Sequence, residues 1–342
     1  LMFVLNYHPD LPAEEIFAAY RAFDERFGRP LRSAWCAHAN ERQPSRRLRV
    51  GYVSPDFRRH SCRHFVEPLL DHHDKSALEV FAYADVLAED EVSARMQSRV
   101  EHWVTTVGMS DTQMAGRIRA DGIDILVDLA GHTRGNRLLV FARKPAPVSL
   151  TTLIGYGCTT GLSAIDWCLT DPYASPEGSD HLLSERPWRI SQWAAYRPAE
   201  EMGEAGPLPA IEQGRVSFGT LTRAVRINHR TVRVWSEILR RVPGSILRMD
   251  SGNFRDAGLC ESLARQFAGH GIEADRLRMG FHSPPWDLMR QMDITLDCFP
   301  HNSGTTLFES LYMGVPFISL AARPSVGRLG SSILANAGHP EW

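Results

Sequence analysis

Short apolar runs alternate with amphipathic stretches along most of the chain. Unbroken apolar runs of the kind found in buried parallel strands occur at residues 48–54, 78–84, 103–107, 123–129, 148–156 and 166–170. Between them, apolar residues recur at helical spacing at residues 62–72, 93–102 and 111–120. This alternation predicts a parallel sheet with helices on both faces.

The alternation starts again after residue 214. It predicts strands at residues 216–221, 245–249, 276–281, 294–299 and 315–320, and helices at residues 232–241, 256–268 and 305–313. Residues 201–214 are acidic and rich in proline and glycine, which is typical of a surface linker. We therefore predict an α/β protein of two tandem Rossmann-like lobes, residues 47–200 and 215–342, and expect the ligand in an interlobe cleft.

The first 46 residues carry one further helical pattern. Within residues 13–27, apolar side chains recur at helical spacing, namely Ile16, Phe17, Ala19, Tyr20 and Phe23. We interpret residues 1–46 as a helical connector that acts as a docking arm. Because the chain starts without methionine and stops just after a helical pattern, we expect a fragment of a longer protein, with its second lobe truncated.

Composition and charge exclude several classes of protein. The chain is 43% hydrophobic and 23% charged, with a formal net charge of −2, so neither disorder nor general binding to nucleic acid or anionic membranes is indicated. No apolar run approaches the roughly 20 residues that span a bilayer. The six cysteines include no C-x-x-C pair, so we expect no zinc site or disulfide framework, and a cytoplasmic location.

One loop has the residues expected around a diphosphate. Residues 297–309 leave a predicted strand and open a predicted helix, and residues 303–306 lie where backbone N–H groups and the helix dipole favour an anion. Glu309, one turn into the helix, could accept from ribose hydroxyls. The alternative is plain capping, because Thr306 and Glu309 have capping-box spacing, with Gly314 and Pro316 as stop signals.

Three further loops follow predicted strands. Arg223 and Arg226 could each donate paired hydrogen bonds to phosphate oxygens. The alternative is that they lie on a solvated helix face. In the first lobe, His60 could act as a base or donor with Asp56 holding its loop, and His132 follows another strand at the same edge. Structural roles are the alternative for both histidines.

Missing motifs constrain the chemistry as well. No two aspartates are separated by one residue, and neither a P-loop nor a G-x-G-x-x-G dinucleotide loop is present. We therefore expect no metal and no cofactor. Charge on a leaving group would be neutralised by backbone N–H groups and arginine.

Several motifs occur in one order along the chain. They are Gly51-Tyr-Val-Ser54 with Asp56, Phe57 and His60; residues 121–127; Gly131-His-Thr133; Lys144-Pro-Ala-Pro-Val148; residues 155–161 and 171–176; and residues 296–316. Together they resemble the catalytic region of the O-linked N-acetylglucosamine transferase and SPINDLY family of protein O-glycosyltransferases. The resemblance covers residue 47 to the end of the chain.

The resemblance implies a glycosyltransferase-B architecture and an inverting, metal-independent transfer of a sugar from a nucleotide diphosphate to protein serine or threonine. It also implies N-terminal helical repeats as a further part of the full-length protein. The donor would be UDP-N-acetylglucosamine. Gly131-His132-Thr133 is closer to the SPINDLY branch, so GDP-fucose as donor remains an alternative, and a catalytically silent scaffold is a third possibility.

Site residues follow by position in the matching motifs. The donor phosphates would meet Gly304, Thr305 and Thr306; the ribose would meet Glu309; and Arg226 stands where the family usually has a lysine. Arg223 replaces the glutamine of the glucosamine-transferring members. His60, with His132 as a second catalytic candidate, would lie beside sugar and acceptor in a pocket lined by a loop that includes Gly155, Tyr156 and Thr160. Pro285 stands where the family has a histidine near the nucleotide base, and we expect His282 to take the place of that histidine.

Overall fold

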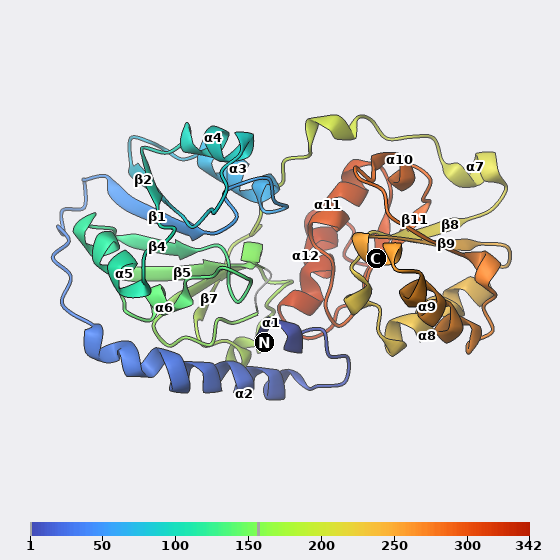
Figure 1. Cartoon of the computed structure of the whole chain (residues 1–342), viewed down its shortest axis with the longest axis horizontal. Coiled ribbons are helices and arrows are strands. Elements are labelled where there is room, and N and C mark those ends of the chain that lie inside the picture. The colour runs from blue at the N-terminus through green and yellow to red at the C-terminus, as the bar shows by residue number, and fades with distance from the viewer. Residues whose placement is uncertain (1, 156–157) are drawn as a thin grey trace. The chain divides into compact units, whose positions relative to one another are not determined.

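The computed structural model describes residues 2–155 and 158–342 and divides them into two units, each built on one parallel sheet (Figure 1). Unit 1 contains Leu11–Arg197 and unit 2 contains Pro198–Arg323 and Gly327–Trp342. Short segments complete them: Asn6–Asp10 belongs to unit 2, and Pro324–Val326 belongs to unit 1. The predicted linker, residues 201–214, therefore lies within unit 2.

The sheet of unit 1 has seven strands in the order β3-β2-β1-β4-β5-β6-β7, and every neighbouring pair is parallel. Strand order reverses direction between β1 and β4. In open α/β sheets this switch point, at the carboxyl ends of the strands, is where ligands bind. The strands are β1 Leu48–Ser54, β2 Leu78–Ala84, β3 His102–Thr105, β4 Ile125–Asp128, β5 Val148–Thr152, β6 Trp167–Thr170 and β7 Arg186–Arg189.

Helices α3 and α4 pack against each other in unit 1, as do α5 and α6. The core between the sheet and the α5/α6 pair includes Tyr83, Met114 and Phe141, each fully buried. The helices are α1 Met2–Leu5, α2 Ala13–Phe23, α3 Arg63–Asp71, α4 Glu91–Gln97, α5 Asp111–Ala120 and α6 Leu138–Phe141.

The sheet of unit 2 has five parallel strands in the order β10-β9-β8-β11-β12, so its switch point lies between β8 and β11. Its largest core cluster is centred on Trp235 of α8 and Phe267 of α9. The elements are α7 Pro209–Gln213, β8 Ser217–Thr220, α8 His229–Arg241, β9 Ile246–Asp250, α9 Ala257–Ala268, β10 Leu277–Gly280, α10 Trp286–Met289, β11 Ile294–Leu296, α11 Thr305–Tyr312, β12 Phe317–Ile318 and α12 Leu329–Asn336.

Several predicted element boundaries were wrong. The helix expected at residues 93–102 is α4, because Asp90 and Ser93 form a capping box that starts it at Glu91. The strand expected to reach residue 299 ends at Leu296, because the chain folds back around Asp297. Strand β7 was missed. It contains a proline and is half exposed, as an edge strand can be.

The predicted helix at residues 13–27 is α2 followed by a π-helical turn, Asp24–Gly28. Its backbone approaches the loop at Gly161 closely, where a β-carbon would lie 2.3 Å from the Tyr20 carbonyl oxygen. Ile16 and Tyr20 are buried. Residues 11–34 thus belong to unit 1 and pack along the rest of it.

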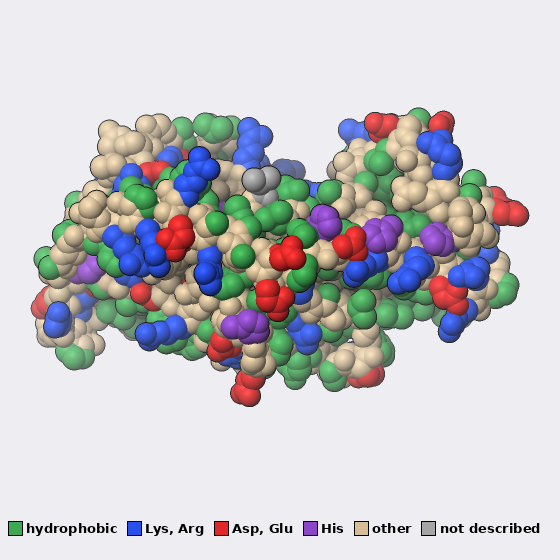
Figure 2. Space-filling model, turned by 90° about the horizontal axis from the view of Figure 1, so that it is seen from below, with side chains coloured by type: hydrophobic (Ala, Val, Ile, Leu, Met, Phe, Trp, Pro, Cys, Tyr) green, Lys and Arg blue, Asp and Glu red, His purple; other side chains and the backbone are tan. Residues whose placement is uncertain are grey.

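The surface carries charges of both signs. On the face drawn in Figure 2, basic and acidic side chains are interspersed with apolar ones, as the near-zero net charge predicts. None of the helices in the described part of the chain combines the length and apolar character that a bilayer crossing requires.

Candidate active site

The two predicted phosphate loops meet at the switch point of unit 2. The loop after β8 carries Arg226, and the loop after β11 carries Ser303. The Arg226 Nη1 atom lies 3.4 Å from Ser303 Oγ, and Ser303 Oγ lies 3.4 Å from Thr222 Oγ1. Asn228 ties the loops together by donating to the Phe299 carbonyl oxygen at 2.6 Å.

Asp297 shapes the loop after β11. Its Oδ1 accepts from the backbone N–H groups of Cys298 and Ser303, both at 2.8 Å, and its Oδ2 accepts from Ser319 Oγ at 2.8 Å. Burial raises the pKa of this carboxyl to about 6, although these hydrogen bonds and the Arg226 charge oppose the rise. The carboxylate thus turns the chain so that Ser303 faces the arginine.

The pKa of Asp297 predicts an unusual pH dependence. Its ordinary value of 3.8 is raised to about 6 by folding, so between these values the folded state binds more protons than the unfolded state, and the contribution of Asp297 to stability falls as pH rises. We expect the free energy of unfolding of the wild type, minus that of Asp297→Asn, to fall by about 2 kcal/mol between roughly pH 4 and 6, and by about 3 kcal/mol in all before it levels off above about pH 7. Denaturant titrations at several pH values measure this difference. A difference that rises with pH over that range would contradict the assignment.

Helix α11 begins at the site. Its N-cap is Gly304, so Thr305 and Thr306 are its first two residues. The capping-box alternative is therefore wrong, because Thr306 lies inside the helix and not at its cap. The predicted stop is confirmed, because Gly314 has a φ of 74° just after the helix. The backbone N–H groups of the first residues of α11 and the positive end of its dipole lie beside Ser303. These are the groups that bind an anion at a helix N-terminus.

Glu309 is buried one turn into α11, with only 7% of its surface exposed. Arg223 is exposed and is the residue before the short turn Ala224–Arg226. Of the two arginines, Arg226 is thus the one held against the α11 loop. The contact of Glu309 with a ribose stays a prediction.

His301 and Tyr7 complete the surroundings of the loop. Their rings stack with centroids 4.6 Å apart. Burial and the positive charge of Arg226 lower the pKa of His301 well below its ordinary value, which keeps the imidazole neutral at physiological pH. The segment Asn6–Asp10 that carries Tyr7 is fastened to unit 2 by Arg323, which donates to the carbonyl oxygens of Asn6 and His8.

His282 lies after β10, next to Asp250 at the end of β9. Its Nδ1 lies 2.6 Å from Asp250 Oδ2, and its backbone N–H donates to Asp250 Oδ1 at 3.0 Å. The side chain of His282 is 56% exposed. This pairing orients the imidazole with its second nitrogen available to hydrogen-bond a ligand, but contact with a nucleotide base stays a prediction.

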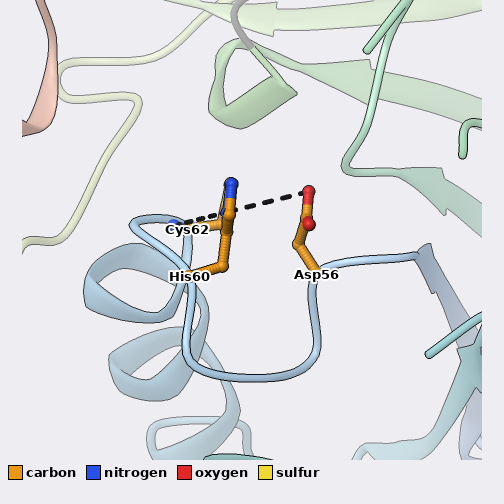
Figure 3. Close-up of side chains that lie close together, drawn as sticks. All are labelled: Asp56, His60 and Cys62. Carbon is orange, nitrogen blue, oxygen red and sulfur yellow. Dashed lines mark hydrogen bonds and ion pairs between the residues drawn. The ribbon is translucent and has the colours of Figure 1, made fainter. Parts of the chain in front are cut away.

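In unit 1, the loop after β1 carries His60. The His60 Nδ1 atom lies 3.7 Å from Asp56 Oδ2 and 3.3 Å from the Cys62 backbone N–H nitrogen (Figure 3). The loop after β4, on the other side of the switch point, carries His132. The sequence placed both histidines at the carboxyl edge of this sheet, and the topology confirms that placement.

His132 has contacts that account for it structurally. Its Nε2 lies 2.7 Å from the Thr160 carbonyl oxygen, and its ring meets the edges of Tyr20 and Phe23. Burial lowers the pKa of this imidazole. With one ring nitrogen engaged by backbone, His132 holds the loops of unit 1 and α2 together, and its catalytic role stays a prediction.

In the predicted pocket loop, the described residues Thr159 and Thr160 are held by a buried carboxylate. Glu185 accepts from the Thr160 backbone N–H at 2.8 Å and from Thr159 Oγ1 at 2.7 Å, and the Thr160 hydroxyl also donates to it. Gly155 lies against the backbone of Ala130. Tyr156 lies outside the described residues.

Gly155 is a position of unit 1 at which a single added methyl group should be strongly destabilising. A β-carbon there would lie 2.5 Å from the Ala130 carbonyl carbon and 2.7 Å from its oxygen, and backbone cannot move aside easily. We expect Gly155→Ala to destabilise the protein by about 3 kcal/mol. Gly116→Ala is the matched control, because that helical glycine has no atom within 4 Å of the added carbon, and it should be neutral or slightly stabilising. Thermal unfolding compares the two, and equal melting temperatures would contradict this packing.

Comparison with known proteins identifies the family. The model of glycosyl transferase family 41 matches residues 31–190 and 210–342. The chain belongs to this family. It is 34% identical to the Arabidopsis thaliana protein named "Probable UDP-N-acetylglucosamine--peptide N-acetylglucosaminyltransferase SPINDLY" over 350 residues, which cover 98% of this chain and 38% of that protein. It is 30% identical to the protein of the same enzyme name designated SEC from Arabidopsis thaliana, over 86% of this chain and 31% of that one.

Solved structures of glycosyltransferases have the same fold as this chain. A mutant of the Thermobaculum terrenum O-GlcNAc transferase superposes with a TM-score of 0.92 at 33% identity, covering 98% of this chain and 64% of that one. The lipopolysaccharide outer core galactosyltransferase WaaB shares the fold at 14% identity, with a TM-score of 0.52 over 81% of this chain and 82% of that one. The predicted glycosyltransferase-B fold class is confirmed. The family 41 chain spans only about 38% of the length of its first curated relative.

Sequence reasoning about the family 41 chain missed some residues that build the site. Asp297 was quoted only as the start of its loop, yet it orients that loop through three hydrogen bonds. Asp128 does the same in unit 1: it ends β4 and accepts from the backbone N–H groups of Ala130 and Gly131. The available signal was an aspartate directly after an apolar run in both lobes. Tyr7 gave no such signal, because its partner His301 is almost 300 residues away.

Proposed function

We propose that this family 41 chain is the catalytic region of a protein O-glycosyltransferase that moves N-acetylglucosamine from UDP-N-acetylglucosamine to serine or threonine hydroxyls of proteins. Two lines support the proposal: the family itself, and relatives whose names specify this donor and a peptide acceptor. The observation that carries it is local. Arg226, Ser303 and the start of α11 converge at the switch point of unit 2, where a diphosphate would be neutralised.

The transfer would be a single displacement with inversion. The acceptor oxygen forms a bond to the anomeric carbon as the bond from that carbon to the diphosphate oxygen breaks, and the acceptor proton passes to a base or to solvent. Charge that develops on the departing diphosphate would meet the Arg226 guanidinium and the amides of Thr305 and Thr306. These groups supply the stabilisation without a metal ion on the phosphates.

His60 is the proposed partner of the acceptor hydroxyl. Its Nδ1 faces Asp56 on one side and the Cys62 backbone N–H on the other. The Cys62 N–H donates to Nδ1 at 3.3 Å, which favours the tautomer that carries its proton on Nε2. A proton on Nδ1 directed at Asp56 would replace that hydrogen bond and leave Nε2 able to accept the acceptor proton. Asp56 would therefore favour the tautomer that serves as a base.

The donor assignment is tested by product analysis. We expect full-length protein incubated with acceptor proteins and UDP-N-acetylglucosamine to leave N-acetylhexosamine on serine or threonine, seen by mass spectrometry, both with and without EDTA. GDP-fucose is the parallel incubation, and deoxyhexose on the acceptors in place of hexosamine would overturn the donor assignment. No modification from either donor, together with no nucleotide binding by calorimetry, would favour a silent scaffold. N-terminal repeats and a cytoplasmic location stay predictions.

A further inference from the structure

The loop after β1 brings three different potential metal ligands together. Between β1 and α3, the chain makes a tight path in which the Asp56 backbone N–H donates to Ser54 Oγ and the Arg63 N–H donates to the His60 carbonyl oxygen. As a result, the side chains of Asp56, His60 and Cys62 lie close together (Figure 3).

The spacing of the three ligand atoms is close to that of a tetrahedral site. A carboxylate oxygen of Asp56, a ring nitrogen of His60 and the Cys62 sulfur all lie within 4.8 Å of one another, and the Asp56–His60 pair is at 3.7 Å. Ligands bound at ordinary zinc distances are separated by about 3.3 to 3.8 Å. Closing the triangle thus needs only side-chain adjustments of roughly an ångström.

The ligand set selects a class of ion. Thiolate and imidazole favour borderline ions such as Zn²⁺ and Co²⁺, whereas Mg²⁺ and Ca²⁺ require mostly oxygen ligands. Three protein ligands leave a fourth position for water. The side chain of His60 is 34% exposed and that of Asp56 is 12% exposed, so an ion can enter past the imidazole. The spacing of cysteines in the sequence could not reveal this site, because it uses a single cysteine.

We propose that Asp56, His60 and Cys62 bind a divalent transition-metal ion, which in the cell would be Zn²⁺. We also propose that the bound ion inhibits sugar transfer. On binding, the thiol proton is released to solvent and a sulfur–metal bond forms. Coordination through His60 Nδ1 would take the place of the Cys62 backbone N–H, which donates to this nitrogen at 3.3 Å. It would leave the ring proton on Nε2, so His60 could no longer accept a proton there. The inhibition, unlike the binding, rests on the proposed function of His60.

Cobalt spectroscopy tests the binding. We expect purified, reduced protein titrated with Co²⁺ to develop a sulfur-to-cobalt charge-transfer band in the near ultraviolet and visible bands of four-coordinate intensity, both removed by Zn²⁺. Cys62→Ala should abolish the charge-transfer band while circular dichroism stays native. Cys36→Ala is the matched control, because Cys36 is an exposed free thiol, and it should retain the band. His60→Gln should weaken Co²⁺ binding roughly tenfold or more.

Two results would overturn the site: a charge-transfer band that survives in Cys62→Ala, or no such band in the wild type at any Co²⁺ concentration. The inhibition is measured separately, as the sugar-transfer rate with Zn²⁺ relative to the rate of the same protein without it. That ratio should be well below one for the wild type and much closer to one for Cys62→Ala. Cobalt binding at Cys62 without any effect of Zn²⁺ on transfer would reject the inhibition alone.

Discussion

Replacing Arg226 by alanine should lower the rate of sugar transfer by about 10²- to 10³-fold, which is the effect of removing one preorganised group that stabilises a developing negative charge. The guanidinium lies against Ser303 in the loop before α11. Its charge opposes the rise that burial causes in the pKa of Asp297, and adds to the lowering that burial causes in the pKa of His301, so it acts at this site. The loss should appear mainly in kcat measured with UDP-N-acetylglucosamine, and thermal unfolding should change little because Arg226 is only partly buried.

Two variants make this test specific. Arg226→Lys keeps the charge, although not the planar fork, and should retain much more activity than Arg226→Ala. Arg223→Ala removes a guanidinium three residues away that is exposed, and its effect should be at least tenfold smaller. An Arg226→Ala protein with the turnover of the wild type would reject the assigned role.

Replacing Asp297 by alanine should destabilise unit 2 by roughly 3 to 5 kcal/mol, because two buried donors and one half-buried donor would lose their acceptor at once. These donors are the backbone N–H groups of Cys298 and Ser303 and the hydroxyl of Ser319. The loop would no longer hold Ser303 toward Arg226, so UDP affinity should fall as well. Chemical denaturation and calorimetry measure the two effects.

Asp287→Ala is the control for this substitution. Asp287 lies on α10 with 97% of its side chain exposed, and its carboxylate is paired with Arg290 at 2.8 Å. Its removal should cost less than about 0.5 kcal/mol. If both aspartate variants unfolded at the same denaturant concentration, the proposed role of Asp297 in shaping the loop would be wrong.

The sequence predicted the parts of the fold that depend on continuous apolar runs. Strands β1 and β2 were predicted with their observed bounds, because their apolar residues are buried on both faces of the sheet. The loops after β8 and β11 were each predicted as candidate phosphate loops. They lie side by side because β8 and β11 are neighbouring parallel strands, whose carboxyl ends share one edge.

Other features depend on contacts that no local pattern specifies. Strand β11 ends early because the Asp297 side chain replaces the next ladder bonds, and the sequence alone does not distinguish that aspartate from a turn residue. The stacking of Tyr7 on His301 joins opposite ends of the chain. Likewise, the grouping of Asp56, His60 and Cys62 depends on the path of an irregular loop.

The decisive measurement is a crystal structure of the full-length protein with UDP, grown in the presence of EDTA. We expect the diphosphate at the start of α11, with its oxygens hydrogen-bonded to the amides of Thr305 and Thr306 and to the guanidinium of Arg226, and with no ion between them. A diphosphate bound away from Gly304, or bound only when a divalent cation bridges it to carboxylates, would contradict it.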